Sequence, residues 1–220
     1  LGEACATALA REGALVVINS RNQADLDACA ERIEKATGHR PKTVVGDLTT
    51  EAGRAGLVAG CPDADILVNN NAGPPPGQFA DWDRAAWLNA LDNNMLAPIF
   101  MIQALLPGMK QLGGGSIIVI GATASRRGGA GAAAFAQAKA AQRTLAESMA
   151  RQLWPQGIHV ALIVIDGIVD LPRSRERFAD KGDDFFVQPT AVAESAWWLA
   201  QQPRSAWSFE IEARPFAEKW

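Results

Sequence analysis

"GSIIVIGATASRRGGAGAAAFAQAKAA", residues 115–141, gives the clearest indication of the fold class. It begins with a run of β-branched and aliphatic residues, passes through a glycine-rich loop, and continues into an alanine-rich segment that favours helix. The apolar run is continuous and does not alternate with polar residues, which is typical of a strand covered on both faces. A strand of this kind followed by a long helix predicts one unit of a parallel α/β sheet.

The same alternation of strand and helix continues along the chain. Further apolar runs predict strands, and helical spacing of apolar residues predicts helices between them. The pattern as a whole predicts one domain over 1–220, a Rossmann-type doubly wound parallel sheet with helices on both faces. The expected strands are 14–20, 42–48, 65–70, 115–121, 159–166 and 207–213, and the expected helices are 2–12, 23–38, 83–112, 130–154 and 190–202.

The N-terminal stretch "LGEACATALAREGALVVINSR", residues 1–21, has the order of a glycine turn, a helix and a strand. This is the second half of a dinucleotide-binding β-α-β unit, in which Gly2 would be the last glycine of the turn. A simple helix start is the alternative interpretation of Gly2. The first strand of such a unit should precede Leu1, so we expect the natural chain to be longer. A molecule beginning at Leu1 would have a gap of roughly 10 Å in its sheet.

Composition disfavours several classes of partner. The net charge of −3 and the pI near 5.5 argue against nucleic acid and anionic membranes as partners. Cys5, Cys29 and Cys61 show no metal-ligand spacing, so we expect no metal and predict reduced thiols in a cytoplasmic protein. No apolar run approaches the roughly 20 residues of a membrane span.

The ordered segments resemble the short-chain dehydrogenase/reductase family over essentially the whole chain. "VVINSRN" (16–22) resembles the second strand of the family, "GDL" (46–48) its adenine contact, and "ILVNNNAG" (66–73) its Asn-Asn-Ala-Gly signature. The resemblance implies a dinucleotide site. Arg21, with no acid at the strand tip, would meet the 2′-phosphate of NADP in preference to NAD, although a plain surface arginine is the alternative. The other implied cofactor contacts are Gly2, Asp47, Leu48, Asn71, Ala72, Gly73, Lys139 and Gly167.

The catalytic positions of the family are half retained. "LDNNMLAPIF" (91–100) resembles the segment with the catalytic asparagine, here Asn94, which would hold a water beside the lysine, here Lys139. A helix-interior asparagine with a local backbone hydrogen bond is the alternative interpretation of Asn94. The tyrosine position is Phe135, and the chain contains no tyrosine. The serine position is Ala122, with Thr123 and Ser125 as the nearest hydroxyls.

The missing phenol sets the functional question. Reduction of a carbonyl needs a hydride at carbon and a proton at oxygen, and Phe135 has no proton to give. General acid–base catalysis contributes about 10²–10⁴-fold, so its loss predicts a slow enzyme unless another group substitutes. Three interpretations stay open. The chain is an NAD(P)-dependent oxidoreductase of carbonyl or alcohol substrates that uses Lys139, Thr123, Ser125 or a water held by Asn94. It is otherwise a weak or inactive cofactor-binding homologue, acting as a sensor or partner subunit, or an interaction protein without cofactor.

Two further expectations concern the surface. The long helices predicted over 83–112 and 130–154 are the segments through which members of the resembled family pair, so we expect a homodimer or homotetramer. The segments "PPPGQFADWDRAAW" (74–87) and "LPRSRERFADKGDDFFV" (171–187) are expected to line or cover the substrate pocket. The charges of the second segment fit a solvated lid equally well.

Overall fold

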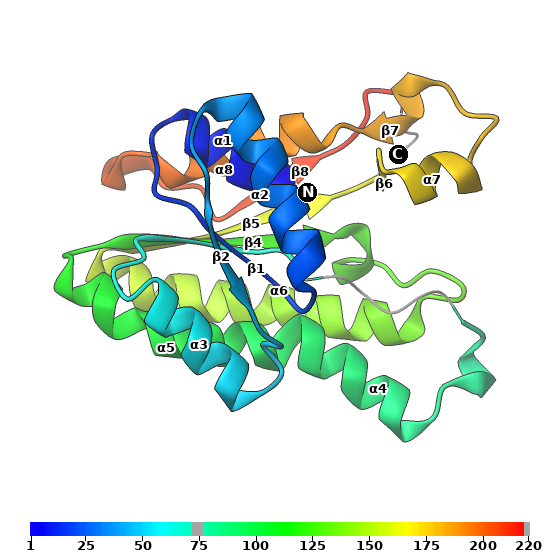
Figure 1. Ribbon diagram of the computed structural model, residues 1–220. Helices are drawn as coiled ribbons and strands as arrows, with labels where there is room; N and C mark the ends of the chain where they lie inside the picture. Colours follow the sequence, from blue (N-terminus) through cyan, green and yellow to red (C-terminus); the bar gives the residue numbers. More distant parts are fainter. Residues whose placement is uncertain (72–76, 218–220) are drawn as a thin grey trace.

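The computed structural model describes residues 1–71 and 77–217 (Figure 1). Its centre is a four-stranded sheet in the order β3 (Ile66–Asn69), β4 (Gly115–Ala122), β5 (Ile158–Ile165) and β8 (Glu210–Ala213). Every pair of neighbours in this sheet is parallel. The predicted parallel α/β architecture is confirmed.

Helices cover both faces of this sheet (Figure 1). α5 (Ala97–Gln111) and α6 (Ala133–Leu153) lie on one face, and α1 (Gly2–Arg11) and α8 (Pro189–Ala200) lie on the other. Along β4, Ile117 and Val119 pack toward the first pair of helices, while Ile118 and Ile120 pack toward the second. Because both faces are buried, β4 and β5 are apolar at almost every position, which explains their unbroken apolar runs.

A second, smaller sheet is formed by β1 (Val17–Ser20) and β2 (Lys42–Val45), which are also parallel. In the described part of the chain no strand joins β1 to β3, so the order of strands breaks at the position where the gap was expected. The small sheet is flanked by α2 (Gln23–Thr37) and α3 (Glu51–Gly60). It is connected to the rest of the molecule partly through Ala6 and Ala10 of α1, which pack against Ile33 of α2.

The structure differs from the sequence prediction in several elements. The helix expected over 83–112 is divided into α4 (Arg84–Leu91), a π-helical turn η2 (Asp92–Leu96) and α5. α3 was not predicted, since Gly53, Gly56 and Gly60 weaken its helical signal. α7 (Pro172–Arg177) and the two-stranded sheet of β6 (Ile168–Val169) and β7 (Phe186–Val187) were not predicted either.

Short 3₁₀ turns complete the chain. They are η1 (Phe79–Asp81), η3 (Thr123–Ser125), η4 (Trp154–Gln156), η5 (Asp183–Phe185) and η6 (Arg204–Ala206). The three cysteines are free thiols. In the described ranges, no helix has the length and apolar character that crossing a membrane would require.

Candidate active site

A polar pocket of about 270 Å³ lies where several strands and loops end. In a parallel sheet the carboxyl ends of the strands share one edge, and ligands of this fold class bind there. Of the predicted cofactor residues, Arg21, Asp47, Leu48 and Asn71 are brought together in its wall. The residues lining it are Asn19, Ser20, Arg21, Gly46, Asp47, Leu48, Thr49, Asn70, Asn71, Asn89, Asn93 and Ala97.

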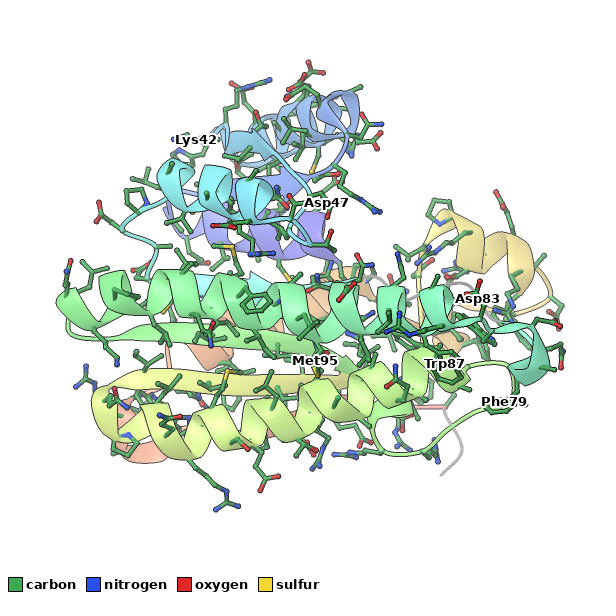
Figure 2. All side chains as sticks on the ribbon, turned by 90° about the horizontal axis from the view of Figure 1, so that it is seen from below. Lys42, Asp47, Phe79, Asp83, Trp87 and Met95 are labelled. Atoms are coloured by element: carbon green, nitrogen blue, oxygen red, sulfur yellow. The ribbon has the colours of Figure 1, made fainter. Side chains whose placement is uncertain are left out.

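Hydrogen bonds fix the shape of this pocket. The Asn19 side chain donates to the carbonyl oxygens of Val44 (2.9 Å) and Gly46 (3.2 Å), which ties the end of β1 to the end of β2. The Asp47 carboxylate accepts from the backbone N–H (2.9 Å) and the hydroxyl (2.8 Å) of Thr49. These bonds lower the pKa of Asp47 and hold it as an anion in the pocket wall. Figure 2 shows Asp47 beyond the carboxyl end of β2 and Lys42 at its start.

The other predicted cofactor residues have different surroundings. Gly2 lies beside the pocket, because a Cβ there would come within 3.2 Å of the Asn70 amide nitrogen. At Gly167 a Cβ would meet Pro215 at 2.7 Å and Val187 at 2.9 Å, so the close packing of the chain itself requires glycine. Ala72 and Gly73 lie outside the described residues.

Lys139 is buried within α6, with only 3% of its surface exposed. Its ammonium donates to the backbone carbonyl of Ile120 in β4 (2.9 Å) and to the side-chain Oε1 of Gln142 (3.0 Å). Burial lowers the pKa of Lys139 to about 8. The ammonium lies 5.7 Å from the ring centroid of Phe135, one helical turn earlier, so the lysine and the tyrosine position are adjacent as predicted from their spacing.

The hydroxyl candidates are both engaged within the chain. Ser125 donates to the backbone carbonyl of Ala122 at 2.7 Å. Thr123 forms a short hydrogen bond with the carboxylate of Asp166 and lies 3.2 Å from the carbonyl of Ile165. Since a hydroxyl has one proton to donate, neither group is free to protonate a ligand in this arrangement.

Asp166 is the centre of a charge cluster at the carboxyl ends of β4, β5 and β8. It follows β5 directly, is 6% exposed, and accepts from the guanidinium groups of Arg214 and, at 3.3 Å, Arg127. Arg214 also donates to Glu212 in β8 (2.6 Å). Through Arg214, Asp166 therefore fixes the last strand to the end of β5.

Asn94 is fully buried in the π-helical turn between α4 and α5. Its amide nitrogen donates to the carbonyl of Ala90 (3.0 Å), and Ala90 packs against Ala134 and Ala138 of α6. Asn94 therefore lies four residues after Ala90, the residue through which α4 contacts α6, the helix that carries Lys139. π-Helical turns of this kind are frequent at functional sites.

A second pocket of about 470 Å³ lies between α7, β7 and the residues after β8. Four residues of the segment 171–187 line it, namely Arg175, Asp183, Asp184 and Phe186. Arg175 binds Asp170 in its wall, lowers the pKa of that carboxyl to about 2, and lies 4.1 Å over the ring of Phe186. The lining residues are Asp170, Arg175, Asp183, Asp184, Phe186, Gln188, Pro215 and Phe216.

The other segment expected at the pocket, residues 74–87, carries a cluster of aromatic rings next to the start of α4. The ring of Trp87 lies 6.1 Å from both Phe79 and Trp82. Trp82 and Trp87 pack against Ala134 and Ala138 of α6. Figure 2 shows Phe79, Asp83 and Trp87 at this end of the molecule. The aromatic group thus lies next to the helix that carries Phe135.

Sequence reasoning missed part of the site. Asn19, Asn70, Asn89 and Asn93 also line the polar pocket, and their signal is the density of asparagine at strand and helix ends. Gln142 was missed because it lies in an alanine-rich segment that indicates only a helix. The sequence feature that could have identified it is a polar residue three positions after Lys139, on the same face of that helix.

The fold and the site define an α/β protein with a polar ligand pocket at the carboxyl edge of a parallel sheet. Residues 1–182 match the family model of short chain dehydrogenases. The chain therefore belongs to the short-chain dehydrogenase/reductase family, a family of oxidoreductases.

Three similar proteins illustrate the relationship. The chain is 31% identical over 195 residues to the human dehydrogenase/reductase SDR family member 4, covering 86% of this chain and 69% of that protein. It is 32% identical to a short-chain dehydrogenase structure from Rhodopseudomonas palustris, with a TM-score of 0.80 and coverage of 97% and 92%. A metagenomic short-chain oxidoreductase solved in complex with NADP is 26% identical, with a TM-score of 0.82 and coverage of 99% and 92%.

Proposed function

We propose that this protein is an NADP-dependent oxidoreductase that interconverts a carbonyl and an alcohol, with Lys139 as its proton donor. The observation that carries the proposal is the polar pocket in which Arg21, Asp47, Leu48 and Asn71 converge. A relative solved with NADP supports the choice of cofactor. When bound, the dinucleotide supplies or accepts the hydride.

The pocket residues suit a phosphorylated adenosine. In the described residues no carboxylate lies within ion-pair distance of Arg21, so its guanidinium can receive a 2′-phosphate. Asp47 and Leu48 form the turn at the end of β2 that would meet the adenine. Asn71 follows β3 and would lie beside the ribose.

Lys139 is the group best prepared to replace the phenol. A general acid works best when its pKa lies near the operating pH, and the pKa of Lys139 is about 8. An ammonium has three N–H groups, whereas Thr123 and Ser125 have their single proton engaged within the chain. In reduction, Lys139 would give one proton to the substrate oxygen and be left as a neutral amine, which water then reprotonates.

The 470 Å³ pocket is our candidate for the substrate side. Its wall includes Pro215, which follows Arg214 in the chain and lies close to Gly167. Its wall combines the carboxylates of Asp170, Asp183 and Asp184 with aromatic rings. A substrate that enters here would approach the end of β5.

The test is reduction of a panel of aldehydes and ketones, followed by the loss of NADPH absorbance. We expect slow turnover that falls by about 10²-fold or more in Lys139→Met. Lys110→Met, an exposed lysine at the end of α5, is the matched control and should be unaffected. Turnover that survives in Lys139→Met would contradict the role of Lys139.

A second function is favoured by the residues at the tyrosine and serine positions. Phe135 and Ala122 together remove the two hydroxyls that the family uses, and the nearby Thr123 and Ser125 hydroxyls are engaged. A cofactor-binding homologue with little activity, acting as a sensor or partner subunit, fits these residues. Saturable NADPH binding without turnover on any carbonyl of the panel would support this function over the first.

A further inference from the structure

Gln142 is an unusual residue for its place in α6. The buried side of this helix consists of Ala134, Ala138, Lys139, Gln142, Ala146, Ala150 and Leu153. Gln142 is only 2% exposed. An amide buried among alanines is unfavourable unless its polar atoms are hydrogen-bonded. Packing alone therefore does not explain why a glutamine occupies this position.

The contacts of Gln142 give that reason. Its Oε1 accepts from the Lys139 ammonium at 3.0 Å. An ammonium only donates, so the amide must present its oxygen to Lys139 and turn its nitrogen away. That nitrogen is buried and has no hydrogen-bond partner in the described structure. An apolar side chain would fill the same space without this unsatisfied group, so the lysine contact is the interaction that justifies the glutamine.

The surroundings of Lys139 are otherwise uncharged. Within the described ranges no carboxylate forms an ion pair with it, and its other acceptor is the backbone of Ile120. The strand β4 beneath it has no titratable side chain. The charged or titratable groups on α6 and the elements packed against it are Arg84 of α4, Asp92 in the π-helical turn, His159 of β5, Arg143 of α6, which is bound to Glu210, Glu147 and Arg151 of α6, which pair with each other, and Arg126, Arg127 and Asp166 around η3.

We propose that Gln142 is a positioning residue for Lys139, which anchors the ammonium at the backbone of β4 through a neutral oxygen. A neutral partner holds the ammonium without forming the strong ion pair that a carboxylate would form. The lysine can then leave this position for a ligand and lose its proton readily. The inference rests on the proposed function in that it assigns Lys139 to the cofactor and the substrate.

Direct titration of Lys139 tests the inference in the full chain without cofactor. Lysine side chains labelled with ¹³C at Cε are followed by NMR, and the Lys139 signal is identified by its absence in Lys139→Met. We expect the wild-type signal to titrate near pH 8. Gln142→Glu should move the midpoint upward by about one pH unit or more, because an opposite charge favours the ammonium. Gln142→Met, of similar size, should move it downward, because the ammonium loses an acceptor.

Gln152→Glu is the matched control, since it adds the same charge to an exposed position of the same helix. It should leave the Lys139 midpoint unchanged. The two Gln142 variants are expected to shift in opposite directions, which a loss of packing alone does not produce. A midpoint that is the same in wild type, Gln142→Glu and Gln142→Met overturns the inference.

NADPH affinity separates this inference from the proposed function. If the wild type binds NADPH, Gln142→Glu should weaken binding about tenfold or more, because the ion pair would hold Lys139 away from the cofactor. A tenfold loss of affinity corresponds to about 1.4 kcal/mol of binding free energy. Gln152→Glu should bind like wild type. Unchanged affinity in Gln142→Glu overturns the positioning role. If the wild type does not bind NADPH while the two midpoints shift as expected, the proposed cofactor is wrong and the anchoring of Lys139 by Gln142 stands.

Discussion

The buried ammonium of Lys139 donates hydrogen bonds to two neutral oxygen atoms, from Ile120 and Gln142. Burial of an ammonium with neutral partners disfavours its charged form, which is why the pKa of Lys139 falls to about 8. The adjacent ring of Phe135 gives no proton. At the scale of single residues, the chemistry of the site therefore depends on an amine whose pKa has moved from its ordinary value toward neutral pH.

This arrangement predicts a stability effect. The unfolded chain binds the Lys139 proton up to about pH 10.5, whereas the folded chain releases it near pH 8, so stability should rise with pH between these values and be lowest below pH 8. At pH 7, Lys139→Met should therefore raise the free energy of unfolding by up to about 3 kcal/mol. Urea unfolding of both proteins at pH 7 and pH 10 checks this. A variant less stable than wild type at pH 7 would contradict the expected cost of burying this charge without an ion-pair partner.

The missing hydroxyls predict a gain of activity. The double variant Phe135→Tyr, Ala122→Ser places a phenol next to Lys139 and a hydroxyl at the end of β4. Turnover of a carbonyl substrate with NADPH should rise by about 10²–10⁴-fold, because a phenol adds general acid catalysis. The measurement is kcat/KM, with Phe135→Leu, Ala122→Ser as the control that lacks the phenol. No gain in a variant that still binds NADPH would mean that the site does not use acid–base catalysis at this position.

At the scale of elements, the two sheets differ in how they are supported. β4 and β5 lie inside a four-stranded sheet with helices on both faces, whereas β1 and β2 pair only with each other in the described structure. A two-stranded sheet is marginally stable by itself and depends on the helices packed against it. The wall of the polar pocket that holds Arg21 and Asp47 is built on this weaker sheet.

Amide hydrogen exchange should report this difference. We expect the amides of β1 and β2 to exchange faster than those of β4 and β5, because local opening is easier where fewer strands and buried contacts hold an element. NADPH should slow exchange in β1 and β2 more than in β5, because the ligand would join the walls of the pocket. Equal exchange rates in the two sheets would contradict this expectation.

The elements also show what the sequence could and could not predict. The runs at β4 and β5 were predictable because a strand buried on both faces must be apolar throughout. The glycines of α3 weaken its helical propensity, and α7 is only six residues long, so the local sequence predicted neither helix. The adjacency of Phe135 and Lys139 followed from helical periodicity. The contacts of Lys139 with Ile120 and Gln142, and of Thr123 with Asp166, depend on side-chain directions between elements, and no local pattern encodes them.

At the scale of the whole molecule, the two pockets lie at the ends of the strands and the long helices α5 and α6 lie on one face of the sheet. We expect two or four copies of the chain to pair through these helices. Thr144 and Ser148 are small, exposed residues one turn apart on α6 and allow close approach of a second helix.

Light scattering in solution checks the predicted assembly. Wild-type protein should have the mass of a dimer or tetramer, and Ser148→Arg should reduce it, because an arginine has no room in a close contact of small residues. Gln156→Arg, exposed beyond the end of the helix, is the matched control and should keep the assembly. A wild-type mass equal to the 23.4 kDa of one chain would exclude pairing.

Titration of the protein with NADPH and NADH, followed by cofactor fluorescence, tests the dinucleotide site most directly. We expect saturable binding, with NADPH bound about tenfold or more tightly than NADH, since Arg21 would hold the 2′-phosphate. Arg21→Ala should remove this preference and leave the NADH affinity nearly unchanged. Absence of binding by either nucleotide, or an NADPH preference that persists in Arg21→Ala, would contradict the account.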